Sequence, residues 1–357
     1  MAMICFAMFF VISLQLSKSF AKYHWQQVFI TTQQRGFLMN RPNQIQRLDP
    51  EISKMFCANK LAQGFDLDDV AAARRFYDEE REKSGPAMQQ TEHSLHEQKM
   101  VTSYDGANIL LNIVRPKQAG PHPAILWMHG GGFVMGQSKF DIPLLQLWAE
   151  QLQVVAASVE YRLAPEHPYP AGLEDAWSSL VSLGDEGYVD AGRIAIGGAS
   201  AGGGLAAGLA LLARDRGGVG LLGQALVYPM LDCRNIAPPQ DEDDDFLVWS
   251  RANNQQAWAA YLGPKPINND HTPIYASPSL AGDLSGLPPT FIPTGALDLF
   301  LHENMAYAGS LIAGGTPTEL QVFPGACHAF NGFFPTAQVS KRCNQAIFDF
   351  FQRILQP

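Results

Sequence analysis

A serine flanked by glycines, between an apolar run and a helical run, constrains the fold of this chain most strongly. Residues 194–197 are short, apolar and rich in β-branched side chains, a pattern that predicts a buried strand. Residues 205–214 have the composition of a helix. Gly198 and Gly202 lie two positions either side of Ser200, where small residues let a neighbouring chain pass without Cβ clashes. A serine at such a turn is strained and exposes its hydroxyl, so Ser200 is the candidate nucleophile.

Composition and charge narrow the class of protein. The chain has 357 residues, of which 46% are hydrophobic and 17% charged, so it can bury a large core as one α/β domain with an embedded lid or as two domains. A net charge of −9 argues against nucleic acid, which needs a basic footprint. The contiguous acidic run 241–245 is typical of a solvated loop, not of a spaced cation site. Five scattered cysteines without a C-x-x-C motif suggest no disulfide framework and favour a reducing compartment.

The first forty residues allow two interpretations. Residues 1–12 carry no polar side chain, and Ser19-Phe20-Ala21 resembles the cleavage site of a signal peptide spanning Met1 to Ala21, which would imply secretion. However, no lysine or arginine precedes the apolar run, and it is short of the roughly 20 residues of a membrane span. The alternative is an apolar extension, residues 1–40, on a cytoplasmic protein without a stable membrane span.

Strands and helices alternate along the rest of the chain. Strands are expected at 100–104, 109–115, 124–128, 154–159, 194–197, 225–228, 290–293 and 320–323, and helices at 66–82, 144–151, 173–183, 205–214, 304–313 and 337–355. This order predicts an α/β fold with a mostly parallel sheet covered by helices on both faces. Residues 41–64 are predicted to be a loop, and His93 and His96 to be exposed loop histidines. The irregular stretch 233–289 is too long for a plain connection and indicates part of a lid.

A glycine-rich loop follows the apolar run 124–128. Gly130, Gly131 and Gly132 destabilise any regular element, so their presence needs a reason. Bare backbone N–H groups can approach a carbonyl oxygen as it becomes negative, and each such donor contributes about 10²–10³ in rate. The alternative is a tight turn without a ligand, which the later elbow serine disfavours. The imidazole of His129 more plausibly ties this loop down than acts as a base.

A serine needs a base and an orienting acid. His328 lies just past the last apolar run and Asp298 just past the one before it, both at the carboxyl edge of the predicted sheet. Asp298 could instead cap the following helix, and Glu303 is the second candidate for the acid. His302, near a helix start, could be a surface residue. The order Ser200, Asp298, His328 is that of α/β-hydrolases.

These motifs together resemble the hormone-sensitive-lipase branch of the α/β-hydrolases, the esterases with a His-Gly-Gly-Gly signature. The stretches that carry the resemblance are His129 to Phe133, Tyr161 to Ala171, Gly198 to Gly203, Tyr228 to Asp232, Leu287 to Pro289 and the Asp298/His328 pair. The resemblance covers roughly residue 48 to the C-terminus. It implies a catalytic domain over 96–357, with a helical cap built from 41–95 and an insertion at about 235–283.

The resemblance also implies roles for individual residues. Ser200, His328 and Asp298 would be nucleophile, base and acid. The N–H groups of Gly131, Gly132 and Ala201 would form an oxyanion hole, with Gly130 shaping its loop. The sequence departs from the family pattern at Ala199, where the family usually has an acid, at Gly204, often asparagine, and over 297–302, where members often have Asp-Pro-Leu and a second aspartate.

Hydrolysis of carboxylic esters is the leading interpretation of function, with no cofactor and no metal required. No cluster of basic residues falls near the motifs, which suggests small to medium uncharged substrates. An acyltransferase or lactonase in a biosynthetic pathway could use the same triad. A non-catalytic small-molecule receptor is the alternative from another class, but receptors of this family have replaced the histidine that is present here as His328. A homodimer is compatible with the sequence. Cys327, next to this histidine, is either a packed loop residue, which we favour, or a site for thiol reagents.

Overall fold

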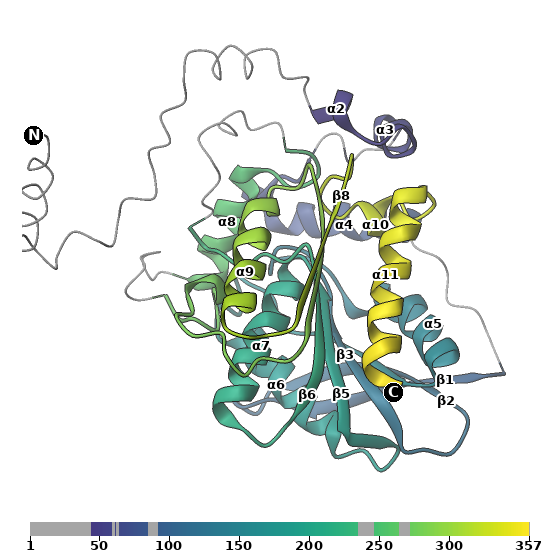
Figure 1. Ribbon diagram of the computed structural model, residues 1–357. Coiled ribbons are helices and arrows are strands. Elements are labelled where there is room, and N and C mark those ends of the chain that lie inside the picture. Colours follow the sequence, from purple (N-terminus) through teal and green to yellow (C-terminus); the bar gives the residue numbers. More distant parts are fainter. Residues whose placement is uncertain are drawn as a thin grey trace, which may run out of the picture. The chain divides into compact units, whose positions relative to one another are not determined.

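The computed structural model describes residues 44–58, 61, 64–84, 92–234, 246–263 and 272–356, all within one compact unit, 43–357. The expected extension 1–40 and parts of the expected cap insertion lie outside the described residues. The strands form one eight-stranded sheet in the order β1-β2-β4-β3-β5-β6-β7-β8 (Figure 1). Its strands are β1 (Ser94–Thr102), β2 (Asn108–Pro116), β3 (His122–Met128), β4 (Val155–Val159), β5 (Val189–Ala199), β6 (Leu221–Val227), β7 (Thr290–Gly295) and β8 (Thr318–Phe323).

The sheet is parallel from β4 to β8 and antiparallel at β1 and β2. The first two strands pair as a hairpin from Ser94↔Pro116 to Thr102↔Asn108. This hairpin begins earlier than its hydrophobic pattern suggested, so the expected boundary between 95 and 96 falls inside β1. The prediction of an exposed loop was wrong for His96, which lies on β1 with Nε2 3.2 Å from Asn112 Oδ1.

Helices cover both faces of the sheet, as expected (Figure 1). On one face lie α5 (Ile142–Leu152) and α11 (Gln338–Leu355), which meet through a ring contact between Trp148 and Phe351. On the other lie α6 (Ala171–Gly184), α7 (Ala201–Arg216) and α9 (Leu301–Ala313). The expected α/β fold is confirmed.

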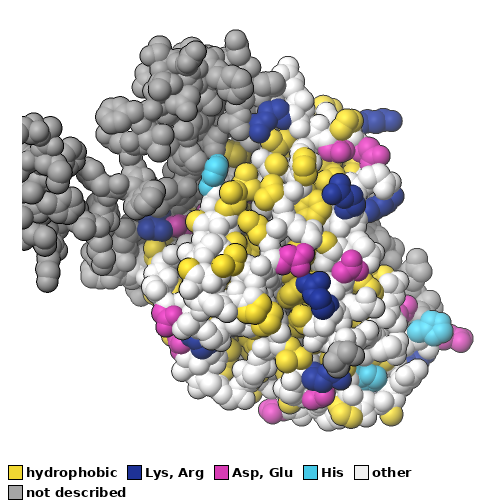
Figure 2. All heavy atoms as spheres, viewed as in Figure 1, with side chains coloured by type: hydrophobic (Ala, Val, Ile, Leu, Met, Phe, Trp, Pro, Cys, Tyr) yellow, Lys and Arg dark blue, Asp and Glu magenta, His cyan; other side chains and the backbone are white. Residues whose placement is uncertain are grey.

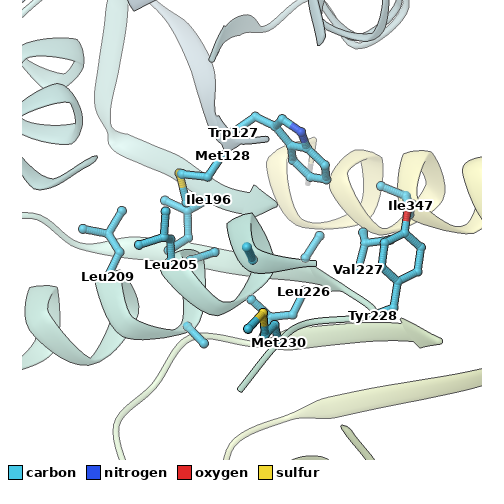
Figure 3. Packing of buried hydrophobic residues seen from close by; sticks show 14 of the residues in the cluster. Trp127, Met128, Ile196, Leu205, Leu209, Leu226, Val227, Tyr228, Met230 and Ile347 are labelled. Carbon is cyan, nitrogen blue, oxygen red and sulfur yellow. The ribbon is translucent and has the colours of Figure 1, made fainter. Parts of the chain in front are cut away.

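The core is made where α7 packs on the middle strands (Figure 3). Leu205 and Leu209 of α7 lie near Ile196 of β5, while Trp127 points to the opposite side. Successive strand residues point to opposite faces, so both faces of this parallel sheet are apolar. All of these side chains are buried, and full burial stabilises the fold by about 1.5–3 kcal/mol for each aliphatic one. The result is a rigid base under the carboxyl ends of the strands.

Two regions expected to be irregular contain helices. Before residue 64 lie α2 (Gln44–Arg47) and α3 (Pro50–Cys57). Asp49 caps α3 by accepting a hydrogen bond from Glu51 N at Oδ1. Pro50 does not interrupt this helix but begins it, because the first helical position needs no N–H donor.

The second missed helix is α8 (Arg251–Leu262), inside the stretch 233–289. Ser250 and Asn253 form a reciprocal capping box at its start. The buried face of α8 contains Asn253 and Asn254 beside Ala257 and Trp258, so polar residues interrupt the apolar stripe that reveals helices in a sequence.

One further α-helix of several turns, α4, and four short elements complete the described chain. They are η2 (Leu67–Asp69), α4 (Val70–Ser84), η3 (Ser138–Asp141), η5 (Pro278–Leu280) and α10 (Phe330–Phe333). Among the residues described, no helix is long and apolar enough to cross a membrane. On the face drawn in Figure 2, lysine and arginine side chains are scattered and interspersed with acidic ones.

Candidate active site

Ser200 lies at a sharp turn between β5 and α7. Its backbone has φ 56° and ψ −120°, a region that costs a non-glycine residue about 1–3 kcal/mol. A Cβ at Gly198 would lie 2.3 Å from Gly202 O, and one at Gly202 would lie 2.1 Å from Met128 O. Only glycine fits at either position, so the two glycines are required by the close backbone approach that creates the turn. The Ser200 N–H is held by Val227 O at 2.9 Å.

The structure brings the three residues expected to form a triad together. His328 Nε2 lies 2.9 Å from Ser200 Oγ, and His328 Nδ1 lies 2.9 Å from Asp298 Oδ2. Asp298 and His328 lie in the loops that follow β7 and β8. All three side chains are buried. A hydroxyl, an imidazole and a carboxylate in this order can pass a proton from the serine to the histidine.

Asp298 also serves the local backbone. Its second oxygen, Oδ1, accepts a hydrogen bond from Phe300 N at 2.9 Å, just before α9. The two interpretations of this residue, capping group and partner of His328, are therefore compatible. Because the two oxygens have different partners, the carboxylate is fixed in orientation.

Aromatic rings hold the imidazole in place. Tyr228 and Phe300 each approach His328 edge-on, with ring centroids 5.0 Å away. The Tyr228 hydroxyl donates to Asn331 Oδ1 at 2.5 Å, and burial raises the pKa of this phenol well above its usual range. The imidazole of His328 is thus held between the carboxylate of Asp298 and two aromatic rings, with Nε2 directed at Ser200.

Glu303, the second candidate for the acid, has a different partner. Its Oε1 accepts from Leu231 N at 2.8 Å and from Asp232 N at 3.4 Å. Burial raises the pKa of this carboxyl well above its ordinary value. Glu303 therefore anchors the loop after β6 and does not orient His328.

The glycine-rich loop bends over Ser200. Gly131 and Gly132 have φ values of 127° and 62°, which a residue with a side chain rarely adopts. The His129 ring ties the loop, since its Nδ1 lies 2.8 Å from Gly130 O and its face stacks on Tyr161. Its Nε2 is buried without a hydrogen-bond partner among the described residues.

Two of the three expected oxyanion donors line the same cavity as Ser200. Within the described part of the chain, the N–H groups of Gly131, Gly132 and Ala201 donate no hydrogen bond. Gly131 and Gly132 line one cavity together with Ser200 and His328. Unpaired N–H groups beside a nucleophile are suited to bind a carbonyl oxygen that becomes negative.

This cavity has a volume of about 280 Å³. Aromatic and aliphatic side chains dominate its wall, among them Phe65, Trp127, Met135, Phe140, Leu144, Leu147, Trp148, Val248, Trp249 and Phe333. Polar groups are few, as is usual for a small-molecule site. The cavity suits an uncharged acyl or alkyl group along most of its wall.

Sequence reasoning missed several residues of this wall, including Arg81 and Asp141. A signal for Arg81 was present, because it lies four residues after Tyr77, on the face of the predicted helix that carries the apolar residues. Cys327, by contrast, is fully buried, and burial raises the pKa of its thiol to about 12. This agrees with a packed loop residue.

Comparisons with known proteins place these features in a family. A family model described as "alpha/beta hydrolase fold" matches residues 125–332. "Carboxylesterase NlhH" of Mycobacterium tuberculosis is 38% identical over 216 residues, which cover 59% of this chain and 67% of the relative. "Esterase LipI" of the same species is 35% identical over 214 residues, with coverages of 59% and 66%.

Solved structures agree over a larger part of the chain. "Bacterial Heroin Esterase" superposes with a TM-score of 0.82 at 35% identity and covers 88% of this chain and 99% of its own. Esterase LipW from Mycobacterium marinum gives a TM-score of 0.78 at 30% identity, with coverages of 89% and 99%. Both matches cover a larger share of the chain than residues 125–332 do.

Proposed function

Since the chain belongs to the α/β-hydrolase family, as its motifs indicated, we propose that it hydrolyses carboxylic esters through an acyl-enzyme on Ser200. The observation that carries the proposal is the hydrogen-bonded series Ser200–His328–Asp298, which opens on an apolar cavity. Relatives named as carboxylesterases and esterases support the reaction. A serine and a histidine 2.9 Å apart are close enough for the proton transfer that begins acyl transfer.

In the first half-reaction, Ser200 Oγ attacks the ester carbonyl carbon while its proton passes to His328 Nε2. Asp298 stabilises the imidazolium that forms, through the bond to Nδ1. The carbonyl oxygen becomes negative and accepts hydrogen bonds from the N–H groups of Gly131, Gly132 and Ala201.

The tetrahedral intermediate then collapses. The bond to the alcohol oxygen breaks, and His328 gives its proton to that oxygen, so that the alcohol leaves neutral. Water attacks the acyl-Ser200 ester in the same way, losing its proton to His328. Collapse of the second intermediate returns the proton to Ser200 and releases the acid.

We further propose that the segments 64–84 and 246–263 act as the cap over this site. Phe65 and Trp249 pack together with ring centroids 6.3 Å apart, and Asn253 Nδ2 donates to Phe65 O at 2.7 Å. Both aromatic side chains line the cavity. The two segments thus support each other and exclude water from the reacting atoms.

Ser200→Ala tests the proposal. The variant is expected to lose cleavage of para-nitrophenyl butyrate by a factor of about 10⁴ or more, with an unchanged circular dichroism spectrum. Ser279→Ala, on η5, is the matched control.

A fluorophosphonate should label the wild type but not the Ser200→Ala variant. If the wild type is not labelled, the result would instead favour a receptor. Product analysis with competing alcohols separates hydrolysis from acyl transfer. Retention of most esterase activity by Ser200→Ala would refute the mechanism.

A further inference from the structure

A guanidinium group forms part of the cavity wall that contains Ser200. Arg81 lies in the last turn of α4 and lines the same cavity as Ser200 and His328. Its Nη1 donates to Gly332 O at 3.1 Å. Gly332 is four residues past His328, so the guanidinium is tied to the segment that carries the base.

The other edge of this guanidinium has no protein partner. Among the described residues, Arg81 Nε is buried without a hydrogen bond, and Nη2 donates none. No acidic side chain among the residues that the structure describes forms an ion pair with Arg81. Arg81 is only partly buried, so Nη2 remains accessible, and the charge of the guanidinium is free to pair with an anionic group in the cavity.

The surroundings fix the position of Arg81 without neutralising it. The Phe140 and Phe333 rings each lie 5.9 Å from its guanidinium carbon. A Cβ at Gly332 would lie 3.0 Å from Nη1, so the glycine leaves room for the side chain. Rings of this kind favour a cation without satisfying its N–H groups.

Asp141 is the acid that lines the same cavity. Its Oδ2 accepts a hydrogen bond from Ser158 Oγ at 2.7 Å. Burial raises the pKa of this carboxyl, while His129 and Arg81 lower it through longer-range attraction. Asp141 therefore does not pair with the guanidinium, and its own charge is disfavoured by burial.

We propose that Arg81 binds a carboxylate carried by the ester substrate, which makes the substrate class half-esters of dicarboxylic acids and similar esters with a second, anionic end. Nη2 is the donor that is both unpartnered and accessible, and a guanidinium N–H forms a charge-assisted hydrogen bond with a carboxylate oxygen. The proposal rests on the proposed esterase function. The proposal replaces the expectation of uncharged substrates. That expectation rested on the absence of basic residues near the motifs in the sequence. Arg81 is far from the motifs in the sequence, but it lines the cavity.

The test compares three ethyl esters of similar size: monoethyl adipate, its neutral amide and ethyl heptanoate. Rates are followed with a pH-stat for the wild type, Arg81→Met and Arg81→Lys. Arg75→Met is the matched control, because Arg75 is exposed on the same helix.

The wild type is expected to prefer monoethyl adipate by about tenfold or more in kcat/KM. Arg81→Met should lower the ratio of kcat/KM for monoethyl adipate to kcat/KM for the two neutral esters by about 10- to 100-fold, the range for charge-assisted hydrogen bonds. Arg81→Lys should restore part of the loss, and Arg75→Met should change nothing. An equal loss for all three esters, or an amide as good as the acid, overturns the proposal.

A measurement of binding affinity tests the role of Arg81 separately from the esterase function. Calorimetry on the Ser200→Ala protein should show tighter binding of monoethyl adipate than of the amide, and the preference should vanish in Ser200→Ala/Arg81→Met. If the wild type cleaves none of the esters, the proposed function fails, while this affinity difference still decides the role of Arg81. Equal affinities for acid and amide would refute it.

Discussion

Replacing Asp298 by asparagine tests the geometry of the site with almost no change in volume. The two carboxylate oxygens have different partners, His328 Nδ1 at 2.9 Å and Phe300 N at 2.9 Å. An asparagine has only one oxygen and must choose between them. If its oxygen keeps the Phe300 N–H, its amide donates to Nδ1 and forces the imidazole proton onto Nε2. His328 would then donate to Ser200 and could not accept its proton.

The magnitude follows from the alternative orientation. In this orientation the oxygen of the asparagine accepts from Nδ1–H of His328. Its NH₂ group then faces the N–H of Phe300, and two buried donors are left without an acceptor, at a cost of about 1–3 kcal/mol. This shifts the tautomer balance by about 5- to 150-fold. Losing the charge-assisted bond to the imidazolium adds about 1.5–3 kcal/mol, or 10- to 150-fold. Together they predict a loss in kcat of about 10²–10⁴.

The assay is the steady-state cleavage of para-nitrophenyl butyrate, with melting temperature and fluorophosphonate labelling measured on the same preparations. Asp283→Asn is the matched control, because Asp283 is exposed and its Oδ1 accepts from Ser285 N, two residues away. KM should change little, since Asp298 does not line the cavity. A variant with kcat within tenfold of the wild type and the same melting temperature would refute the tautomer argument.

Two further predictions concern residues near the site. Gly204→Asn introduces the residue that the family often has, but a Cβ here would lie 2.1 Å from Met230 O; we expect a melting temperature lower by several degrees, and an unchanged one would contradict this contact. Burial raises the pKa of Glu303 well above its ordinary value, so the folded state holds a proton that the unfolded state has released, and stability falls as pH rises above about 4.3. Glu303→Gln keeps an acceptor for Leu231 N and Asp232 N but does not titrate. The melting temperature of the variant minus that of the wild type should therefore increase from pH 4.5 to 8. A difference that stays constant over this range would exclude the titration of Glu303.

Much of the fold could be predicted because the sheet is parallel and buried on both faces. Strands of this kind are short apolar runs, such as that of β3, and helices with one buried face, such as α9 between β7 and β8, separate them. The helices that were missed lack such a pattern: α3 begins with a proline, and the buried face of α8 carries Asn253 and Asn254. Local sequence patterns detect a helix by its apolar face, and they fail where polar residues lie on that face.

The candidate site divides in the same way. Ser200, Asp298 and His328 could be found because each follows a strand of the parallel sheet, and topology brings those ends to one edge. Arg81 could not be found by this rule, because α4 precedes the sheet in the chain. Its place in the cavity depends on how α4 packs on α10, which no motif encodes.

Backbone contacts between the strand-end loops explain how residues distant in the sequence are positioned to a fraction of an ångström. Leu297 N donates to Ala326 O at 2.9 Å, which joins the loop of Asp298 to the loop of His328. A Cβ at Gly295 would lie 2.3 Å from the same oxygen, so this approach requires glycine. Met230 N in turn donates to Ser200 O at 3.0 Å. Backbone contacts therefore fix the relative positions of the three loops that carry these side chains.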